Sequence, residues 1–269
     1  MRIVFFCGSH PRHMYMANKL YETGFLEGLV IENRGEFVPE PPLGLNDLDT
    51  ENFIRHFSAR EQAEEKFFGH VDCNTVKKKV LCKNIDVGAL NNETIVAFIK
   101  DIKPDVILSY GVHKLSDEII DICPNKAFNI HGGLSPWFKG CITLFWPFYL
   151  LRPNWAGLTI HHLSNRIDAG DIVHHSVPNL EKGDKMHEVA CKAVLQAGED
   201  ISIIMKLLAE GKEIPRVKQS PNGKLFVSSE WTPQHLRLIY NTFNDDIVDR
   251  YLDGEIVSPD PKLVKAFEK

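Results

Sequence analysis

The sequence lacks a long hydrophobic run. Its stretches without Asp, Glu, Lys or Arg reach at most 13 residues, at 153–165, and the stretch Gly140–Leu151, which includes Pro147, has 12, whereas a membrane-spanning helix needs about 20 apolar residues. The amino terminus has one basic residue, Arg2, followed by a short apolar run without a small-residue cleavage site, so no secretory signal is predicted. We therefore expect a cytoplasmic protein with no membrane span.

Cysteine is also sparse. The six cysteines are scattered along the chain without a Cys-x-x-Cys pair, which favours reduced thiols, mostly in the core, over disulfides or a zinc site. Two histidine pairs, His161–His162 and His174–His175, are the remaining candidates for metal ligands. Adjacent residues on a strand face opposite sides of a sheet, so neither pair alone makes a metal site, and no metal is expected.

Positive charge is not in excess. The 269 residues include 31 Lys and Arg and 36 Asp and Glu, for a net charge of −5. The one basic cluster, Lys77–Lys79, is too short for a nucleic-acid track and is interpreted as a solvated strand edge. Nucleic acid is therefore a disfavoured partner.

The first half of the chain alternates between short apolar runs and helix-compatible stretches. This alternation is typical of an α/β fold with a mostly parallel sheet. Asn92 is the expected cap of one of the helices. Strands are predicted at 2–8, 26–31, 80–82, 106–109 and 127–131, and helices at 13–22, 49–68 and 92–102.

The second half predicts an apolar helix at 143–151, two strands at 158–162 and 171–177, and a long helix at 185–210 that Gly211 stops. We expect a catalytic domain over residues 1–210 and a small α+β appendage over residues 211–269. In the appendage, Pro221-Asn222-Gly223 predicts a hairpin, and Thr232-Pro233 begins a helix to Phe243. Asn244 is the expected cap of a last short helix ending near Gly254.

Polar residues end the strand at 127–131. Asn129 and His131 are two residues apart and point to the same face, and the glycines and prolines that follow mark the strand end. Ligands in open α/β sheets bind just beyond this carboxyl end. Together with Asp168, these side chains would supply an amide donor, a titratable imidazole and a carboxylate.

This combination resembles the formyltransferases that use 10-formyltetrahydrofolate. In that family, an Asn-x-His strand end, a Leu-x-Pro-x-x-x-Gly-like loop and an Asp-x-Gly loop carry the active site. The matching residues here are Asn129 and His131, then Leu134, Pro136 and Gly140, then Asp168 and Gly170. The resemblance covers roughly residues 1–210 and implies a Rossmann-like formyltransferase core.

The resemblance also implies the chemistry. A substrate amine attacks the formyl carbon of the donor 10-formyltetrahydrofolate, Asn129 and His131 stabilise the tetrahedral oxyanion, and Asp168 favours the imidazolium and accepts the proton of the amine, directly or through water. No metal takes part. The pterin is expected to contact mainly backbone groups of Tyr110, Gly111, Asn165, Arg166 and Ile167.

The acceptor amine is less constrained. The loop Gly8-Ser9-His10-Pro11 is unlike the Gly-x-Gly-Ser-Asn loop of glycinamide ribonucleotide transformylases. Residues 211–269 carry nine basic and nine acidic side chains. This segment has no net positive charge, which disfavours binding of the tRNA of a methionyl-tRNA formyltransferase. The loop from Gly132 to Trp137 resembles that of enzymes that formylate nucleotide-linked amino sugars, which is the favoured acceptor class.

For that acceptor, Arg12, His13 and Lys139 are the expected contacts, the first two with a diphosphate. Methionyl-tRNA formyltransferase and formyltetrahydrofolate hydrolase are the alternative functions, although the hydrolases resemble chains with an additional amino-terminal domain. A cleft of aromatic residues is expected either to stack a base or sugar or to form core. These residues are Trp137, Phe138, Trp146 and Trp155.

The appendage has many apolar residues for two short helices. Packing on the chain's own core is the favoured interpretation, and a homodimer contact is the alternative. The residues concerned are Leu236, Ile239, Tyr240, Phe243, Ile247, Tyr251 and Leu252.

Overall fold

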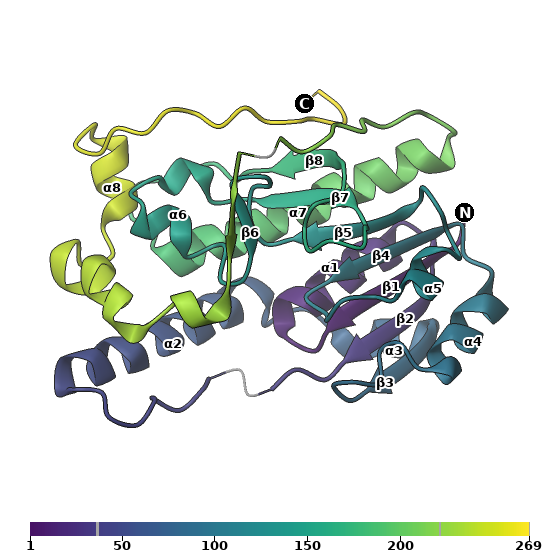
Figure 1. The fold of residues 1–269 in the computed structure, drawn as a ribbon, viewed down its shortest axis with the longest axis horizontal. Coiled ribbons are helices and arrows are strands. Elements are labelled where there is room, and N and C mark those ends of the chain that lie inside the picture. The colour runs from purple at the N-terminus through teal and green to yellow at the C-terminus, as the bar shows by residue number, and fades with distance from the viewer. Residues whose placement is uncertain (36–37, 221, 269) are drawn as a thin grey trace.

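The computed structural model describes residues 1–35, 38–220 and 222–268. A seven-stranded sheet in the order β3-β2-β1-β4-β5-β7-β8 forms the centre of the molecule (Figure 1). The pairs β1–β2, β1–β4, β2–β3 and β4–β5 are parallel, and β5–β7 and β7–β8 are antiparallel. The predicted Rossmann-like fold with a mostly parallel sheet is confirmed. The strands are β1 (Ile3–Gly8), β2 (Leu26–Glu32), β3 (Leu81–Ile85), β4 (Val106–Tyr110), β5 (Ala127–His131), β7 (Leu158–His162) and β8 (Ile172–Ser176).

Helices cover both faces of the sheet, which explains why β1 and β4 are buried along their whole length. Helices α1 (Pro11–Glu22), α3 (Cys73–Lys79) and α7 (Met186–Ala209) pack on one face, where α7 also contacts α2 (Asp47–Phe68). Helices α4 (Glu93–Ile102) and α5 (Asp117–Ile120) pack on the other. The sheet therefore supports the residues at the ends of its strands on both faces.

Local chemistry sets several of the helix ends. The Asn92 side chain accepts a hydrogen bond of 2.9 Å from the Ile95 N–H and caps α4, as predicted. Gly211, with φ of +74°, follows α7 and ends it, also as predicted. Pro11 occupies the first turn of α1, where a missing N–H costs no helical hydrogen bond.

Two predictions in the sheet domain are wrong. Lys77–Lys79 form the last turn of α3, not a strand edge, because the Asp72 carboxylate caps that helix by accepting the N–H groups of Asn74 and Thr75. The predicted helix at 143–151 shortens to α6 (Trp146–Tyr149). The chain leaves helical geometry at Leu151, which has φ of +54°.

The appendage also differs from the predicted hairpin. Pro221 lies outside the described residues, and β9 (Lys224–Phe226) pairs in parallel with β6 (Phe138–Gly140), far back in the sequence. A parallel pair needs a long crossover, so the strand 224–226 does not belong to a local hairpin. The appendage thus attaches to the loop that follows β5.

The rest of the appendage is helical but irregular. The helix predicted from Thr232 is a 3₁₀ turn, Pro233–His235, followed by a π-helical stretch, Leu238–Thr242. The last helix is α8 (Ile247–Leu252), with Asp246 at its N-cap position. Asn244 is not that cap, because it has φ of +50° and lies further from the helix. The appendage also contains the 3₁₀ turn Ser228–Glu230, and another 3₁₀ turn, Pro153–Trp155, precedes β7 in the sheet domain.

The apolar side of the appendage packs on the chain itself, which confirms the favoured interpretation. Leu236, Ile239, Tyr240 and Ile247 are buried in one cluster with residues of the 134–156 region. The final segment then runs along β8, where the His175 N–H donates to the Val264 carbonyl at 2.8 Å (Figure 1). Among the residues described, no helix is long and apolar enough to span a bilayer.

Candidate active site

A cavity of about 890 Å³ lies where the strand order of the sheet reverses. After β1 the chain adds β2 on one side of the β1–β4 pair, and after β4 it adds β5 on the other side. Parallel strands on either side of such a point leave a crevice at their carboxyl ends. Residues that follow β1, β4 and β5 line the cavity, so the fold places it where α/β proteins bind ligands.

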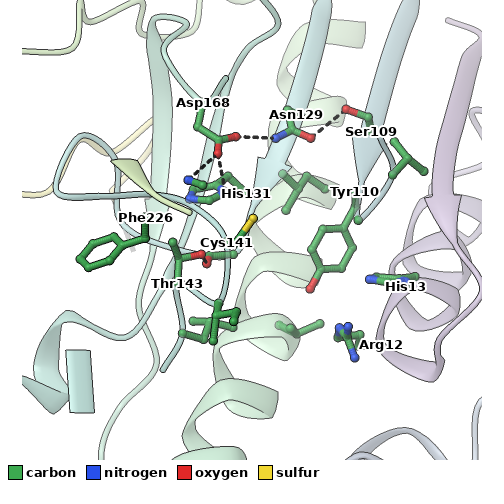
Figure 2. Close-up of a pocket in the computed structure, with 18 of the residues that line it drawn as sticks. Arg12, His13, Ser109, Tyr110, Asn129, His131, Cys141, Thr143, Asp168 and Phe226 are labelled. Carbon is green, nitrogen blue, oxygen red and sulfur yellow. Dashed lines mark hydrogen bonds and ion pairs between the residues drawn. The ribbon is translucent and has the colours of Figure 1, made fainter. Parts of the chain in front are cut away.

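Asn129 enters this cavity from β5. The Ser109 hydroxyl on the neighbouring strand donates to the Asn129 Oδ1 atom at 2.8 Å. This contact sets the orientation of the amide, whose nitrogen points toward Asp168 and lies 3.4 Å from its Oδ1 atom (Figure 2). The amide N–H group is thus directed to the site and its oxygen away from it.

Asp168 reaches Asn129 from the loop between β7 and β8. Its backbone is left-handed, with φ of +46°, a conformation that Asp tolerates better than most residues. Gly170 lets the loop approach β7, because a Cβ atom there would lie 1.7 Å from the His162 carbonyl oxygen. The Asp168 Oδ2 atom accepts the Gly140 N–H at 2.9 Å and lies 3.3 Å from the His131 Nδ1 atom. The structure therefore brings Asn129, His131 and Asp168 together.

Asp168 is held in its ionised form. Burial alone would raise the pKa of this carboxyl, but His131, His161 and the Gly140 N–H stabilise the carboxylate and lower its pKa to about 2. A carboxylate that is largely buried and still charged needs such partners.

His131 has an acceptor next to each ring nitrogen. Its Nε2 atom lies 2.7 Å from the Phe138 carbonyl oxygen and its Nδ1 atom faces Asp168. A neutral imidazole has one N–H and can donate to only one of them. Burial lowers the pKa of His131 despite the opposing effect of Asp168. Asp168 thus favours the imidazolium, as expected, but its charge does not fully offset the effect of burial on the ring.

The neutral ring satisfies the shorter contact by donating from Nε2 to Phe138. The Nδ1 atom then has a free lone pair beside the carboxylate. Only when a proton arrives between Nδ1 and Asp168 can both ring nitrogens donate. The pair is thus arranged to take up one proton.

His161 is a site residue that the sequence analysis considered only as a metal ligand, not as part of the active site. It lies opposite Asn129 in the antiparallel β5–β7 pair. Its Nδ1–H donates to the His162 carbonyl at 2.8 Å, and its Nε2 atom lies 3.3 Å from the Asn129 amide nitrogen and 3.5 Å from the Asp168 Oδ1 atom. The antiparallel register was the missing information, because the sequence alone does not show which β5 residue faces His161.

The residues expected to contact the pterin of the folate donor divide into two groups. Tyr110, Gly111, Arg166 and Ile167 line the cavity, whereas Asn165 is not among the lining residues. The Asn165 carbonyl accepts the Lys114 ammonium at 2.7 Å instead.

Gly111 is more than a turn glycine. It has φ of +67°, and a Cβ atom there would lie 2.3 Å from the Nε2 atom of His13. His13, in the first turns of α1, packs its ring edge-on against Tyr110 with centroids 4.8 Å apart. Burial lowers the pKa of His13 and raises that of Tyr110, so both rings are neutral packing partners at the cavity wall.

The opposite end of the cavity is rich in arginine. Arg12 forms an ion pair with the buried Glu64 carboxylate, and Arg60 lines the cavity nearby. Burial and the positive charge of Arg12 lower the pKa of Arg60 to about 10. Arg34 pairs with the buried Glu32 at 3.2 Å. Among the residues that the structure describes, Glu64 and Glu32 are the carboxylates that pair with Arg12 and Arg34 at this end.

Neither Lys139 nor the aromatic residues considered for a stacking cleft line the cavity. Lys139, expected to contact the acceptor, lies on β6 and is not a lining residue. The aromatic residues considered for a stacking cleft do not line the cavity either and form core. Of these, Phe138, Trp146 and Trp155 are buried, and Trp137 packs against them. The aromatic residues that do line the cavity include Phe145 and Phe226.

Metal ligands are not clustered in the part of the chain that the structure describes. No group of three or more His, Cys, Asp or Glu side chains there could hold a metal ion. Hydrogen bonds and ion pairs between protein groups account for the arrangement of Asn129, His131 and Asp168.

Solved structures share this fold at low sequence identity. A sugar N-formyltransferase from Shewanella sp. is 14% identical, with a TM-score of 0.56 over 89% of this chain and 87% of that chain. A phosphoribosylglycinamide formyltransferase from Anaplasma phagocytophilum is also 14% identical, with a TM-score of 0.53 over 84% of this chain and 98% of that chain. These likenesses establish the fold and do not distinguish acceptors.

Sequence comparison covers the centre of the chain. The bifunctional polymyxin resistance protein ArnA of Wigglesworthia glossinidia brevipalpis is 33% identical over 128 residues, which are 46% of this chain and 19% of that protein. The match thus spans about a fifth of that relative. The formyl transferase family matches residues 60–203, just over half of the chain, including Asn129, His131 and Asp168. On this match and the fold around it, the chain belongs to the formyl transferase family.

Proposed function

We propose that this protein transfers the formyl group of 10-formyltetrahydrofolate to the amine of a nucleotide-linked amino sugar. The observation that carries the proposal is the convergence of the Asn129 amide, the His131 ring and the ionised Asp168 carboxylate at the wall of one large cavity. In the reaction, the amine nitrogen bonds to the formyl carbon and loses a proton. The bond from that carbon to the folate nitrogen then breaks, and this nitrogen takes up the proton, which releases tetrahydrofolate.

Asn129 is assigned to the oxyanion. Its amide nitrogen makes only long contacts, at 3.3 Å to His161 and 3.4 Å to Asp168, so an incoming oxyanion can take one of its N–H groups. Ser109 holds the amide in the orientation this requires. A preorganised donor of this kind typically contributes about 10²–10³ in rate.

Asp168 is assigned to the proton that the amine loses, directly or through water. His131 supports it, because the unprotonated Nδ1 atom 3.3 Å away can share this proton. This role differs from the oxyanion contact expected from the sequence, since both ring nitrogens of His131 already face protein acceptors.

The donor is assigned to the wall formed by the loops after β4 and β7. Tyr110, Gly111, Arg166 and Ile167 line this wall beside Asn129 and Asp168. The Ile167 side chain is 60% exposed and offers an apolar surface to a pterin ring. This placement brings the formyl carbon of the donor to the Asn129 amide.

The acceptor is assigned to the arginine-rich end. Arg12, Arg34 and Arg60 suit a diphosphate, because planar guanidinium groups bind phosphate oxygens in pairs. Pro11 at the start of α1 removes a backbone N–H from the helix end, which favours these side chains over the helix terminus as the phosphate contacts. The cavity volume is near the upper end of the usual range for ligand sites, about 300–1,000 Å³, and is compatible with two substrates.

The test is an assay of tetrahydrofolate release from 10-formyltetrahydrofolate. The purified protein is given no acceptor, a panel of nucleotide-linked amino sugars, glycinamide ribonucleotide, or charged initiator tRNA. Release with an amino sugar, together with a sugar product heavier by one formyl group, is the expected result. Release without acceptor would identify a hydrolase, and release only with the ribonucleotide or the tRNA would overturn the proposed acceptor.

A further inference from the structure

The loop that carries Asp168 is held by a segment beyond the family match. We name this segment the C-terminal strap, residues 216–220 and 222–226. The family match ends at residue 203, yet Leu225 and Phe226 of the strap line the cavity. The strap is therefore part of the site, although it belongs to the appendage.

Gln219 is the strap residue in contact with the Asp168 loop. Its amide nitrogen donates to two backbone carbonyl oxygens, at 2.8 Å to Asp168 and at 2.7 Å to Gly170. Both partners are acceptors only, so the amide orientation is fixed. The two bonds span the turn at which Asp168 adopts its left-handed backbone conformation.

The ends of the strap are anchored independently of Gln219. Val217 and Ile172 exchange backbone hydrogen bonds of 2.7 and 3.0 Å. At the other end, the Phe226 carbonyl accepts the Cys141 N–H at 2.9 Å. The residue before Cys141 is Gly140, whose N–H holds the Asp168 carboxylate. The strap thus supports both the main chain of Asp168, through Gln219, and the carboxylate of Asp168, through the strand that contains Gly140.

We propose that Gln219 is a positioning residue for formyl transfer, which holds the left-handed turn at Asp168 so that the carboxylate faces His131 and Asn129. This inference rests on the proposed function, in which Asp168 accepts the proton of the amine. Gln219 itself touches no substrate. Its removal changes no residue assigned to the donor or the acceptor, but it frees the Asp168 and Gly170 carbonyls and lets the carboxylate move away from His131.

The test compares Gln219→Ala, Gln219→Glu and Arg216→Ala in the full-length protein. Arg216 is the matched control, because it attaches the same strap to Asp171 at 2.9 Å without touching the Asp168 main chain. We expect Gln219→Ala to lower kcat at least tenfold with both KM values within twofold, and Arg216→Ala to stay within twofold of wild type in all three constants. The number of tetrahydrofolate sites per chain, measured by calorimetry, should not change.

Gln219→Glu adds a pH signature that a purely structural role would not give. The ionised side chain repels the two carbonyl oxygens, whereas the protonated acid can donate to one of them. Its kcat relative to wild type should therefore rise as the pH falls from 8 to 5. A flat ratio, or equal losses in Gln219→Ala and Arg216→Ala, would overturn the inference.

Asp168→Asn separates this inference from the proposed function. If Asp168→Asn is inactive while Gln219→Ala has normal kcat, the positioning role is wrong and the proposed function stands. If Asp168→Asn keeps normal kcat, the role of Asp168 and the positioning role of Gln219 are both wrong, while absence of formyl transfer by the wild type would overturn the proposed function.

Discussion

Replacing Asp168 by Asn keeps the size of the side chain and removes its charge. In the folded protein the pKa of Asp168 falls from 3.8 to about 2. At about 1.4 kcal/mol per pKa unit, the ionised carboxylate contributes about 2 kcal/mol of stability at neutral pH. The side chain is only 10% exposed, so solvent screening removes little of this contribution.

The sign of the pH dependence follows from the lowered pKa. The contribution is complete well above pH 3.8, and it is lost as the pH falls through about 2, because the unfolded carboxyl takes up its proton first. About half is already lost at pH 3. The Asn variant lacks this titration, so the difference in unfolding free energy between wild type and variant should shrink by about 1 kcal/mol from pH 6 to pH 3.

Urea unfolding at a series of pH values measures this difference, and steady-state kinetics measures the catalytic effect. Loss of a proton-accepting group typically lowers kcat by about 10²–10⁴, and tetrahydrofolate binding should persist, since the substitution keeps the size of the side chain and changes none of the residues assigned to the donor. A variant with kcat within tenfold of wild type would refute the assigned role. An unfolding free-energy difference that is independent of pH would refute the electrostatic account.

Three further substitutions test the site. His131→Ala should fold normally by circular dichroism and lose about 10²–10⁴ in kcat, as expected for a group that shares in proton transfer; normal turnover would contradict its support of the carboxylate. Ser109→Ala removes one neutral hydrogen bond of about 1 kcal/mol, so kcat should fall roughly fivefold, and an unchanged kcat would show that the amide does not need this contact. Gly111→Ala places a Cβ atom 2.3 Å from His13, whereas Gly88→Ala, at φ of +93°, meets no atom within 4 Å. Both variants lose about 1 kcal/mol of stability because alanine disfavours the left-handed backbone. A greater loss of thermal stability and a higher KM for the formyl donor in Gly111→Ala alone would confirm the close approach to His13. Equal losses in the two variants would contradict it.

The sheet was largely predictable because its strands are continuous apolar runs. Burial on both faces makes β1 apolar throughout, and it makes β4 and β5 apolar except for the polar residues Ser109, Asn129 and His131. Asn129 and His131 could be placed on one face from their spacing alone. Asp168 needed the family resemblance, because 39 residues separate it from Asn129.

Residues that act across long sequence separations could not be predicted. His161 reaches the site only through the register of the antiparallel β5–β7 pair. The strand at 224–226 reads as half of a local hairpin, but Phe226 lies opposite Gly140, and the parallel pairing appears only in three dimensions. Gln219 carries no sequence signal, because its role depends on two backbone carbonyls of a distant turn.

The central claim is that formyl transfer from the folate donor to an amine occurs at Asn129, His131 and Asp168. The most direct measurement is the stoichiometry of tetrahydrofolate and N-formylated sugar nucleotide, quantified together for wild type and for Asp168→Asn, with tetrahydrofolate affinity measured for both proteins. The account predicts equal amounts of the two products from wild type, rates of both products lower by about 10²–10⁴ for the variant, and the same affinity for tetrahydrofolate. Tetrahydrofolate released in excess of formylated sugar, or undiminished transfer by the variant, would contradict it.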